Sequence, residues 1–136
     1  MNKLLLIDDD EDDHFFFKDS IESINPTLHC ETATNGKIAL NKLKASASLP
    51  DLIFLDLNMP VMNGFEFLTQ FKKENALNKV PVGIFTTSNS IRDKELAKDL
   101  GAIFFLTKPN DLKILQKKLQ QILSADFSTG EYIVID

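Results

Sequence analysis

Short apolar runs alternate along the chain with longer segments in which apolar residues recur every three or four positions. A short run bounded by turn residues is typical of a strand in a parallel sheet, and the longer period is that of an amphipathic helix. The pattern predicts strands near residues 4–7, 28–33, 52–55, 80–85 and 103–106. It predicts helices with buried stripes at Phe17, Ile21 and Ile24; Ala39, Leu40, Leu43 and Ala47; Phe65, Leu68 and Phe71; residues 91–100; and Leu112, Leu115, Leu119 and Ile122 or Leu123.

Five strands alternating with five helices predict an α/β fold, a doubly wound parallel sheet with helices on both faces, because strand–helix–strand crossovers are right-handed. Residues 28–33 alternate between apolar and polar, which favours an edge strand. Asp10 or Glu11 is expected to cap the first helix, and Gly101 is expected to end the fourth. Periodicity does not determine the order of the strands.

Polar side chains follow four of the predicted strands. The first strand ends at Asp8-Asp9, the third at Asp56, the fourth at Thr86 and the fifth at Lys108. The carboxyl ends of parallel strands lie on one rim of the sheet, where ligands bind in open α/β folds, so these residues are expected to converge. Three neighbouring carboxylates repel one another unless a cation neutralises them, and an all-oxygen site suits Mg²⁺ better than zinc.

This group of side chains matches the needs of phosphoryl transfer. A lysine and a threonine hydroxyl can hold phosphoryl oxygens, and a carboxylate at Asp56 can attack phosphorus to give an acyl phosphate. The alternative for Asp56 is a strand-end carboxylate that bonds the following turn. Glu11, Asp12 and Asp13 are interpreted as a solvated, acidic helix start.

Composition narrows the function classes. The chain has 136 residues, 43% of them apolar, which is consistent with one domain that has its own core. A net charge of -5 and dispersed lysines argue against direct nucleic-acid binding. A single cysteine, Cys30, excludes an internal disulfide, and isolated His14 and His29 argue against zinc. With no signal peptide and no apolar run near roughly 18 residues, we expect a cytoplasmic protein without a membrane segment.

Taken together, these motifs resemble the receiver domain of two-component response regulators. The resemblance covers residues 3–123 and rests on Asp8-Asp9, on Asp56 within LIFLDLNMPVMNG, on Thr86 and on Lys108-Pro109. Residues 35–40 and 100–102 match as well. The resemblance implies a flavodoxin-like sheet of five strands in the order 2-1-3-4-5, with five helices.

The resemblance also implies a role for each site residue. Asp56 would be the phosphoacceptor, Thr86 and Lys108 would contact the phosphoryl group, and Thr86 with Phe105 would form the conformational switch. The Lys108–Pro109 bond would be cis. The Mg²⁺ cofactor would be held by Asp9 and Asp56 directly, by the backbone carbonyl of Asn58, and by Asp8 through water.

For the whole chain, the resemblance implies a stand-alone signalling phosphoacceptor and not an enzyme. Residues 1–123 would be the receiver domain, and residues 124–136 a tail too short for an output domain. Partners would be a histidine kinase or histidine phosphotransfer protein, an unidentified downstream protein, and possible second copies bound through the face of the fourth helix, fifth strand and fifth helix. Phe15 and Phe16 are candidate docking residues, with packing against a loop as the alternative. Residues 132–135 are strand-like and are expected to pair with an edge strand or a second subunit, or to fray.

Other function classes fit less well. A phosphohydrolase of the haloacid-dehalogenase type would need a second aspartate where this chain has Asn58. A flavodoxin-like cofactor site would need a Ser/Thr-rich phosphate loop after the first strand. A phosphorylation-independent interaction module on the same fold remains the main alternative.

Overall fold

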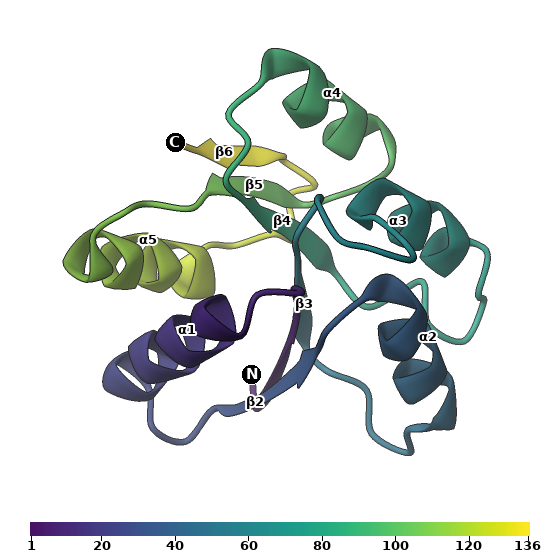
Figure 1. Cartoon of the computed structure of the whole chain (residues 1–136), viewed down its shortest axis with the longest axis horizontal. Helices are drawn as coiled ribbons and strands as arrows, with labels where there is room; N and C mark the ends of the chain where they lie inside the picture. Colours follow the sequence, from purple (N-terminus) through teal and green to yellow (C-terminus); the bar gives the residue numbers. More distant parts are fainter.

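The computed structural model describes residues 1–136 and contains one parallel sheet of six strands in the order β2-β1-β3-β4-β5-β6 (Figure 1). The strands are β1 (Lys3–Ile7), β2 (His29–Ala33), β3 (Leu52–Leu55), β4 (Val82–Thr86), β5 (Phe104–Thr107) and β6 (Ile133–Ile135). The helices are α1 (Glu11–Ile24), α2 (Gly36–Ala45), α3 (Gly64–Lys72), α4 (Ile91–Asp99) and α5 (Leu112–Ser124). The α/β fold class and the order 2-1-3-4-5 are confirmed, and the expectation of only five strands is wrong.

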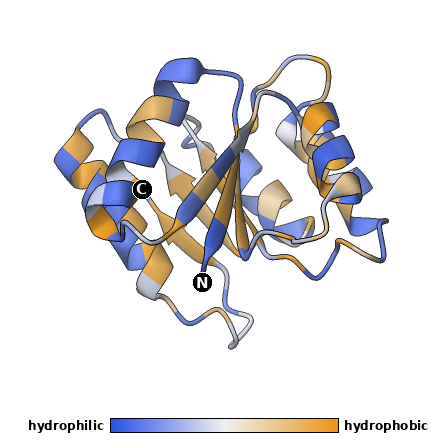
Figure 2. Ribbon diagram, turned by 90° about the horizontal axis from the view of Figure 1, so that it is seen from below, coloured by the Kyte–Doolittle hydropathy of each residue, from blue (hydrophilic) through white to orange (hydrophobic).

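Helices cover both faces of the sheet, as the crossover rule predicts. Helices α1 and α5 pack side by side on one face, and α2, α3 and α4 lie on the other (Figure 1). The strands are mainly apolar, and the helices bear polar residues on their outer sides (Figure 2). None of the helices combines the length and the apolar character needed to cross a membrane.

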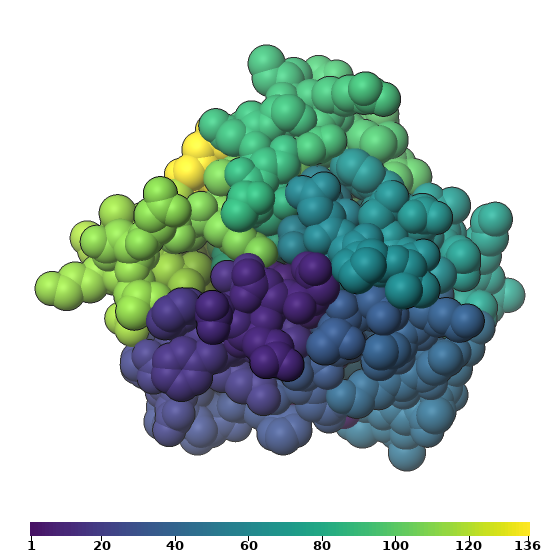
Figure 3. Space-filling view, in the orientation of Figure 1, coloured from purple at the N-terminus to yellow at the C-terminus, as the bar shows by residue number.

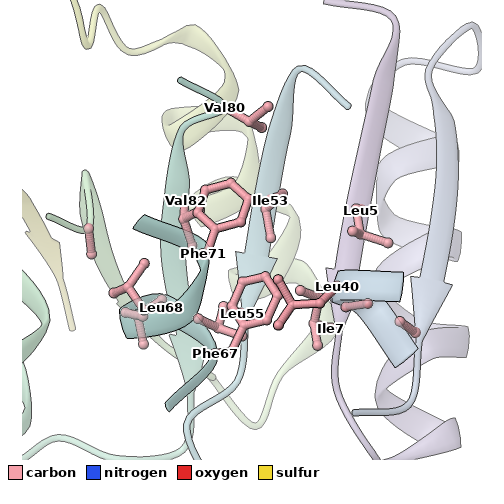
Figure 4. Close-up of a cluster of buried hydrophobic side chains, with 14 of the residues drawn as sticks. Leu5, Ile7, Leu40, Ile53, Leu55, Phe67, Leu68, Phe71, Val80 and Val82 are labelled. Atoms are coloured by element: carbon pink, nitrogen blue, oxygen red, sulfur yellow. The ribbon is translucent and has the colours of Figure 1, made fainter. Parts of the chain in front are cut away.

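Two hydrophobic cores result from the alternation of side chains along the strands. In the core beneath α2, α3 and α4, the α3 rings Phe67 and Phe71 face Ile53 and Leu55 of β3 (Figure 4). In the core beneath α1 and α5, Phe17, Phe54 and Phe104 lie together. Adjacent residues of one strand therefore serve different cores, which fixes the register of the sheet.

Three details of the predicted helix stripes differ in the structure. On α3 the fully buried aromatic is Phe67, and Phe65 is only half-buried. Helix α2 ends at Ala45, before Ala47. On α5, Leu112 is exposed because it is the first residue of the helix, next to the cap at Asp111.

The sixth strand comes from the tail. Strand β6 runs parallel to β5, with Phe104 opposite Ile133 and Leu106 opposite Ile135. Nζ of Lys94 lies 2.6 Å from the Asp136 carboxylate, and the Lys118 ammonium donates to the Asp136 backbone carbonyl. Of the outcomes expected for residues 132–135, pairing with an edge strand of the same chain is the one observed.

Tail residues also pack on both sides of β5. The Tyr132 hydroxyl donates to the backbone carbonyl of Lys94 in α4 at 2.8 Å, and Tyr132 packs against the core that contains Phe105. The Phe127 ring lies 6.0 Å from that of Phe104, centroid to centroid, in the other core. Strand β6 is therefore anchored by side chains as well as by backbone pairing.

Candidate functional site

The strand-end residues converge at one rim of the sheet, as predicted. The backbone N–H of Asp56 donates to Ile7 at 2.9 Å, and that of Lys108 donates to Thr86 at 2.7 Å, so the ladder bonds continue beyond the strands. In Figure 3 the purple residues near the chain start meet teal and green segments in the middle of the visible face. Asp8, Asp56 and Thr86 are buried.

Asp8, Asp9 and Asp56 form an acidic cluster. One carboxylate oxygen from each lies within 4.8 Å of the other two, so a single ion could contact all three residues. Asp8 and Asp56 are buried, whereas Asp9 is exposed and leaves the cluster open to solvent. Clustered carboxylate oxygens are ligands that Mg²⁺ prefers, so the donor set fits this ion. Asn58, expected to contribute its carbonyl, is exposed two residues after Asp56.

Lys108 reaches into this cluster. Its ammonium lies 2.7 Å from an oxygen of Asp8, 2.7 Å from one of Asp13 and 3.5 Å from one of Asp56, and it lies 5.3 Å from the centroid of the Phe85 ring. Burial of Lys108 by itself lowers the pKa of the ammonium. The contacts with Asp13 and Asp8 outweigh burial, so the pKa is raised above its usual value and the lysine carries its charge at neutral pH.

For the Asp8 carboxyl group, burial is the largest influence on the pKa. Burial raises its pKa to about 6, against the opposing effect of the hydrogen bond from Lys108. The backbone N–H of Asp10 also donates to this carboxylate, at 3.0 Å. Nε2 of His14 lies 2.5 Å from the backbone carbonyl of Asp8, which anchors the first turn of α1 against the end of β1. A bound cation would favour the charged carboxylate that burial disfavours.

The backbone around Asp56 is tightly constrained. One oxygen of its carboxylate accepts from the backbone N–H of Leu57 at 2.8 Å, which leaves the other oxygen facing Lys108. A Cβ added at Gly64 would lie 2.4 Å from the Asp56 carbonyl oxygen, so only glycine allows α3 to start this close. In the same loop Val61 has φ of 68°, a strained value for a β-branched residue.

Thr86 and Phe105 occupy positions that link the rim to the core. Thr86 is fully buried, and its hydroxyl accepts from the backbone N–H of Ser88 at 3.3 Å. Phe105 is fully buried beneath α2, α3 and α4. The cis Lys108–Pro109 bond is a correction: the structure contains no cis peptide bond, and trans is the lower-energy form even before proline.

Beside the acidic cluster, α1 and α5 border a hollow of about 270 Å³. It is lined in part by Phe16 of α1, by Phe85 and Lys108 from the sheet rim, and by Leu112 of α5. Phe15 is 66% exposed and Phe16 39% exposed, so neither of these expected docking residues belongs to the core. Asp13 also lines this hollow, and its contact with Lys108 went unpredicted because nothing local marks a partner 95 residues away.

A family model of the response regulator receiver domain matches residues 4–120, so the chain belongs to the receiver domain family of two-component signalling. Among solved structures, the phosphorylated cyanobacterial phytochrome response regulator RcpA superimposes with a TM-score of 0.84 at 29% identity, covering 94% of this chain and 95% of that one. The Mn²⁺-bound form of response regulator Rcp1 gives a TM-score of 0.76 at 30% identity, covering 91% and 93%.

The first curated relatives are longer than this chain. The chain is 46% identical over 86 residues to a protein-glutamate methylesterase/protein-glutamine glutaminase of Treponema denticola, a match that covers 59% of this chain and 21% of that protein. The chain spans less than half the length of each of the first curated relatives it matches. The family is therefore shared with proteins of several architectures, and the receiver domain is the part in common.

Proposed function

We propose that this chain is a response regulator that accepts a phosphoryl group on Asp56 and signals by changing the surface it offers to other proteins. The observation that carries the proposal is the placement of the Lys108 ammonium 3.5 Å from the Asp56 carboxylate, inside a cluster with Asp8 and Asp9. Asp56 is the nucleophile: one of its oxygens forms the bond to phosphorus as the bond from phosphorus to the donor's leaving group breaks. The attacking atom in this proposal is the free Asp56 oxygen, because it faces Lys108 while the other oxygen accepts from Leu57.

Mg²⁺ would be held by Asp8, Asp9 and Asp56, with Asn58 adding its backbone carbonyl. When bound, the ion offsets the negative charge of the carboxylates and of the phosphoryl oxygens. Lys108 pairs with a phosphoryl oxygen, and the Thr86 hydroxyl donates to another. The similar regulator Rcp1 has a solved structure in a Mn²⁺-bound form, which supports the proposal that this chain binds a divalent cation.

A histidine kinase or histidine phosphotransfer protein is the proposed phosphoryl donor. The hollow between α1 and α5 opens beside Lys108 and includes the half-exposed Phe16, with Phe15 exposed nearby. An apolar contact next to the reacting carboxylate would orient a donor helix toward Asp56. Thr86 and Phe105 would transmit the phosphorylated state from the rim of the sheet to the face formed by α4, β5 and α5. A homodimer or target bound at that face would also meet the β6 tail, because β6 covers the edge of β5.

The proposal is tested by the intact mass of the chain after incubation with acetyl phosphate. We expect one phosphoryl adduct that requires both Mg²⁺ and Asp56, and none with Asp56→Asn. Asp51→Asn is the matched control, because Asp51 is an exposed carboxylate before the same strand and lies outside the acidic cluster. A folded chain that forms no adduct would instead favour the phosphorylation-independent interaction module.

A further inference from the structure

Lys108 has two close carboxylate partners, and they belong to different parts of the site. Its ammonium is 2.7 Å from Asp8 and 2.7 Å from Asp13, but only Asp8 is a member of the acidic cluster that fits a metal. Asp13 comes from the first turn of α1, and its side chain is 31% exposed where that of Lys108 is 9% exposed. A cation that engages Asp8 therefore leaves Asp13 as the carboxylate still free to hold the lysine.

We propose that Asp13 is a positioning residue that draws the Lys108 ammonium toward α1 and so limits how strongly the lysine neutralises Asp8 and Asp56. This inference rests on the proposed metal-dependent function. An ammonium has three hydrogen atoms to donate. Two of them are directed to Asp8 and Asp13, and the 3.5 Å separation from Asp56 is longer than a normal hydrogen bond.

Asp13 would influence metal binding because Lys108 and the metal ion compete for the same carboxylates. A positive charge between Asp8 and Asp56 competes with a divalent cation for the same carboxylates, and the interaction is strong because both carboxylates are buried. Without Asp13, Lys108 would pair with the acidic cluster alone, and Mg²⁺ would have to displace it. Loss of a carboxylate that does not itself bind the metal should therefore weaken metal binding.

A substitution at the neighbouring Asp12 is the control for the general electrostatic effect of losing one negative charge. Asp12 lies in the same first turn of α1 and is exposed, and its carboxylate forms no ion pair or hydrogen bond. Asp12→Asn and Asp13→Asn remove the same charge from neighbouring positions and lose a similar interaction with the helix dipole. Only Asp13→Asn removes the contact with Lys108.

The experiment is calorimetric titration of the full chain with MgCl₂ in the absence of any phosphoryl donor. We expect Asp12→Asn to weaken Mg²⁺ binding by less than about twofold and Asp13→Asn to weaken it by roughly threefold or more beyond that. Asp13→Glu, which keeps a carboxylate within reach of the lysine, should restore most of the affinity. In a Lys108→Gln background, the two asparagine substitutions should have the same effect.

The nitrogen resonance of the Lys108 ammonium in the metal-free chain provides a second readout. It should move in Asp13→Asn and stay in place in Asp12→Asn. Equal Mg²⁺ affinities of the two variants, or a difference that persists in the Lys108→Gln background, would overturn this inference alone. A wild-type chain that binds no Mg²⁺ would contradict the proposed function and this inference together.

Discussion

Gly83 of β4 is the position where the addition of one methyl group should cost most. A Cβ at this residue would lie 2.0 Å from Cε2 and Cζ of the Phe104 ring. Non-bonded carbon atoms are at their best separation near 3.5–4.0 Å, so the ring would have to move by roughly 1.5 Å. Phe104 is fully buried, with Phe54 at 5.2 Å and Phe127 at 6.0 Å between ring centroids, so the ring has little free space to enter.

The magnitude follows from two opposing contributions. Overpacking a dense core costs about 1–3 kcal/mol, and the stiffer unfolded chain of an alanine variant returns roughly 0.4–1 kcal/mol. Because the overlap at Gly83 is large and falls on a confined ring, we place the Gly83→Ala cost near the upper end, with a net loss of about 2 kcal/mol. With a urea m-value of roughly 2 kcal/mol/M, the unfolding midpoint should fall by about 1 M.

The assay is equilibrium urea unfolding of a double-mutant cycle with Phe104→Ala. Phe104→Ala alone should cost about 3–5 kcal/mol, because it leaves a cavity. In that background the methyl group of Gly83→Ala enters the cavity, so its further cost should vanish or reverse, which gives a coupling of about 2 kcal/mol. An unchanged midpoint for Gly83→Ala, or an equal cost in both backgrounds, would refute the steric argument.

Two other predictions concern the rim and the tail. Burial, only partly offset by Lys108, raises the pKa of Asp8 to about 6, so the folded chain binds this proton more tightly than the unfolded chain does. The charged carboxylate therefore destabilises the metal-free fold at neutral pH, and this cost disappears as the pH falls through 6 toward 4. In chelator, Asp8→Asn should raise the free energy of unfolding by roughly 3 kcal/mol near pH 7.5 and by almost nothing near pH 4, and a gain that is the same at both would contradict the assignment. Tyr132→Phe removes the hydrogen bond to the Lys94 carbonyl and should lower the free energy of unfolding by about 1 kcal/mol, with faster amide exchange in β6, whereas unchanged exchange would mean that this bond does not hold the tail.

Most of the fold followed from patterns that are local in sequence. The continuous runs before Asp8 and Asp56 predicted strands of a parallel sheet, and the polar residues that end those runs predicted the rim where they meet. Gly101, with φ of 93°, ends α4 as a glycine cap, and Asp10 caps α1. Such features depend on periodicity and turn chemistry, which a single sequence displays.

The features that went unpredicted depend on contacts across the chain. In the sequence, Asp13 is one of several acidic residues typical of a solvated helix start. Its ion pair with Lys108 forms only when the fold brings the two residues together. Residues 133–135 are apolar and strand-like, but their pattern does not say which edge they join. Phe104 and Phe105 are adjacent in β5 and both are fully buried, because the sheet has a core on each face.

Strand β6 also has a consequence for how the sheet avoids aggregation. Without β6, the edge of the sheet on this side would be Phe104–Thr107, an uncharged segment of high β-propensity with open backbone groups. The edge that solvent meets is instead three residues long and is followed by Asp136, whose charge is held beside Lys94. Short edge strands with charged ends are poor templates for the growth of intermolecular sheets. The tail thus replaces an aggregation-prone edge of the receiver sheet with a protected one.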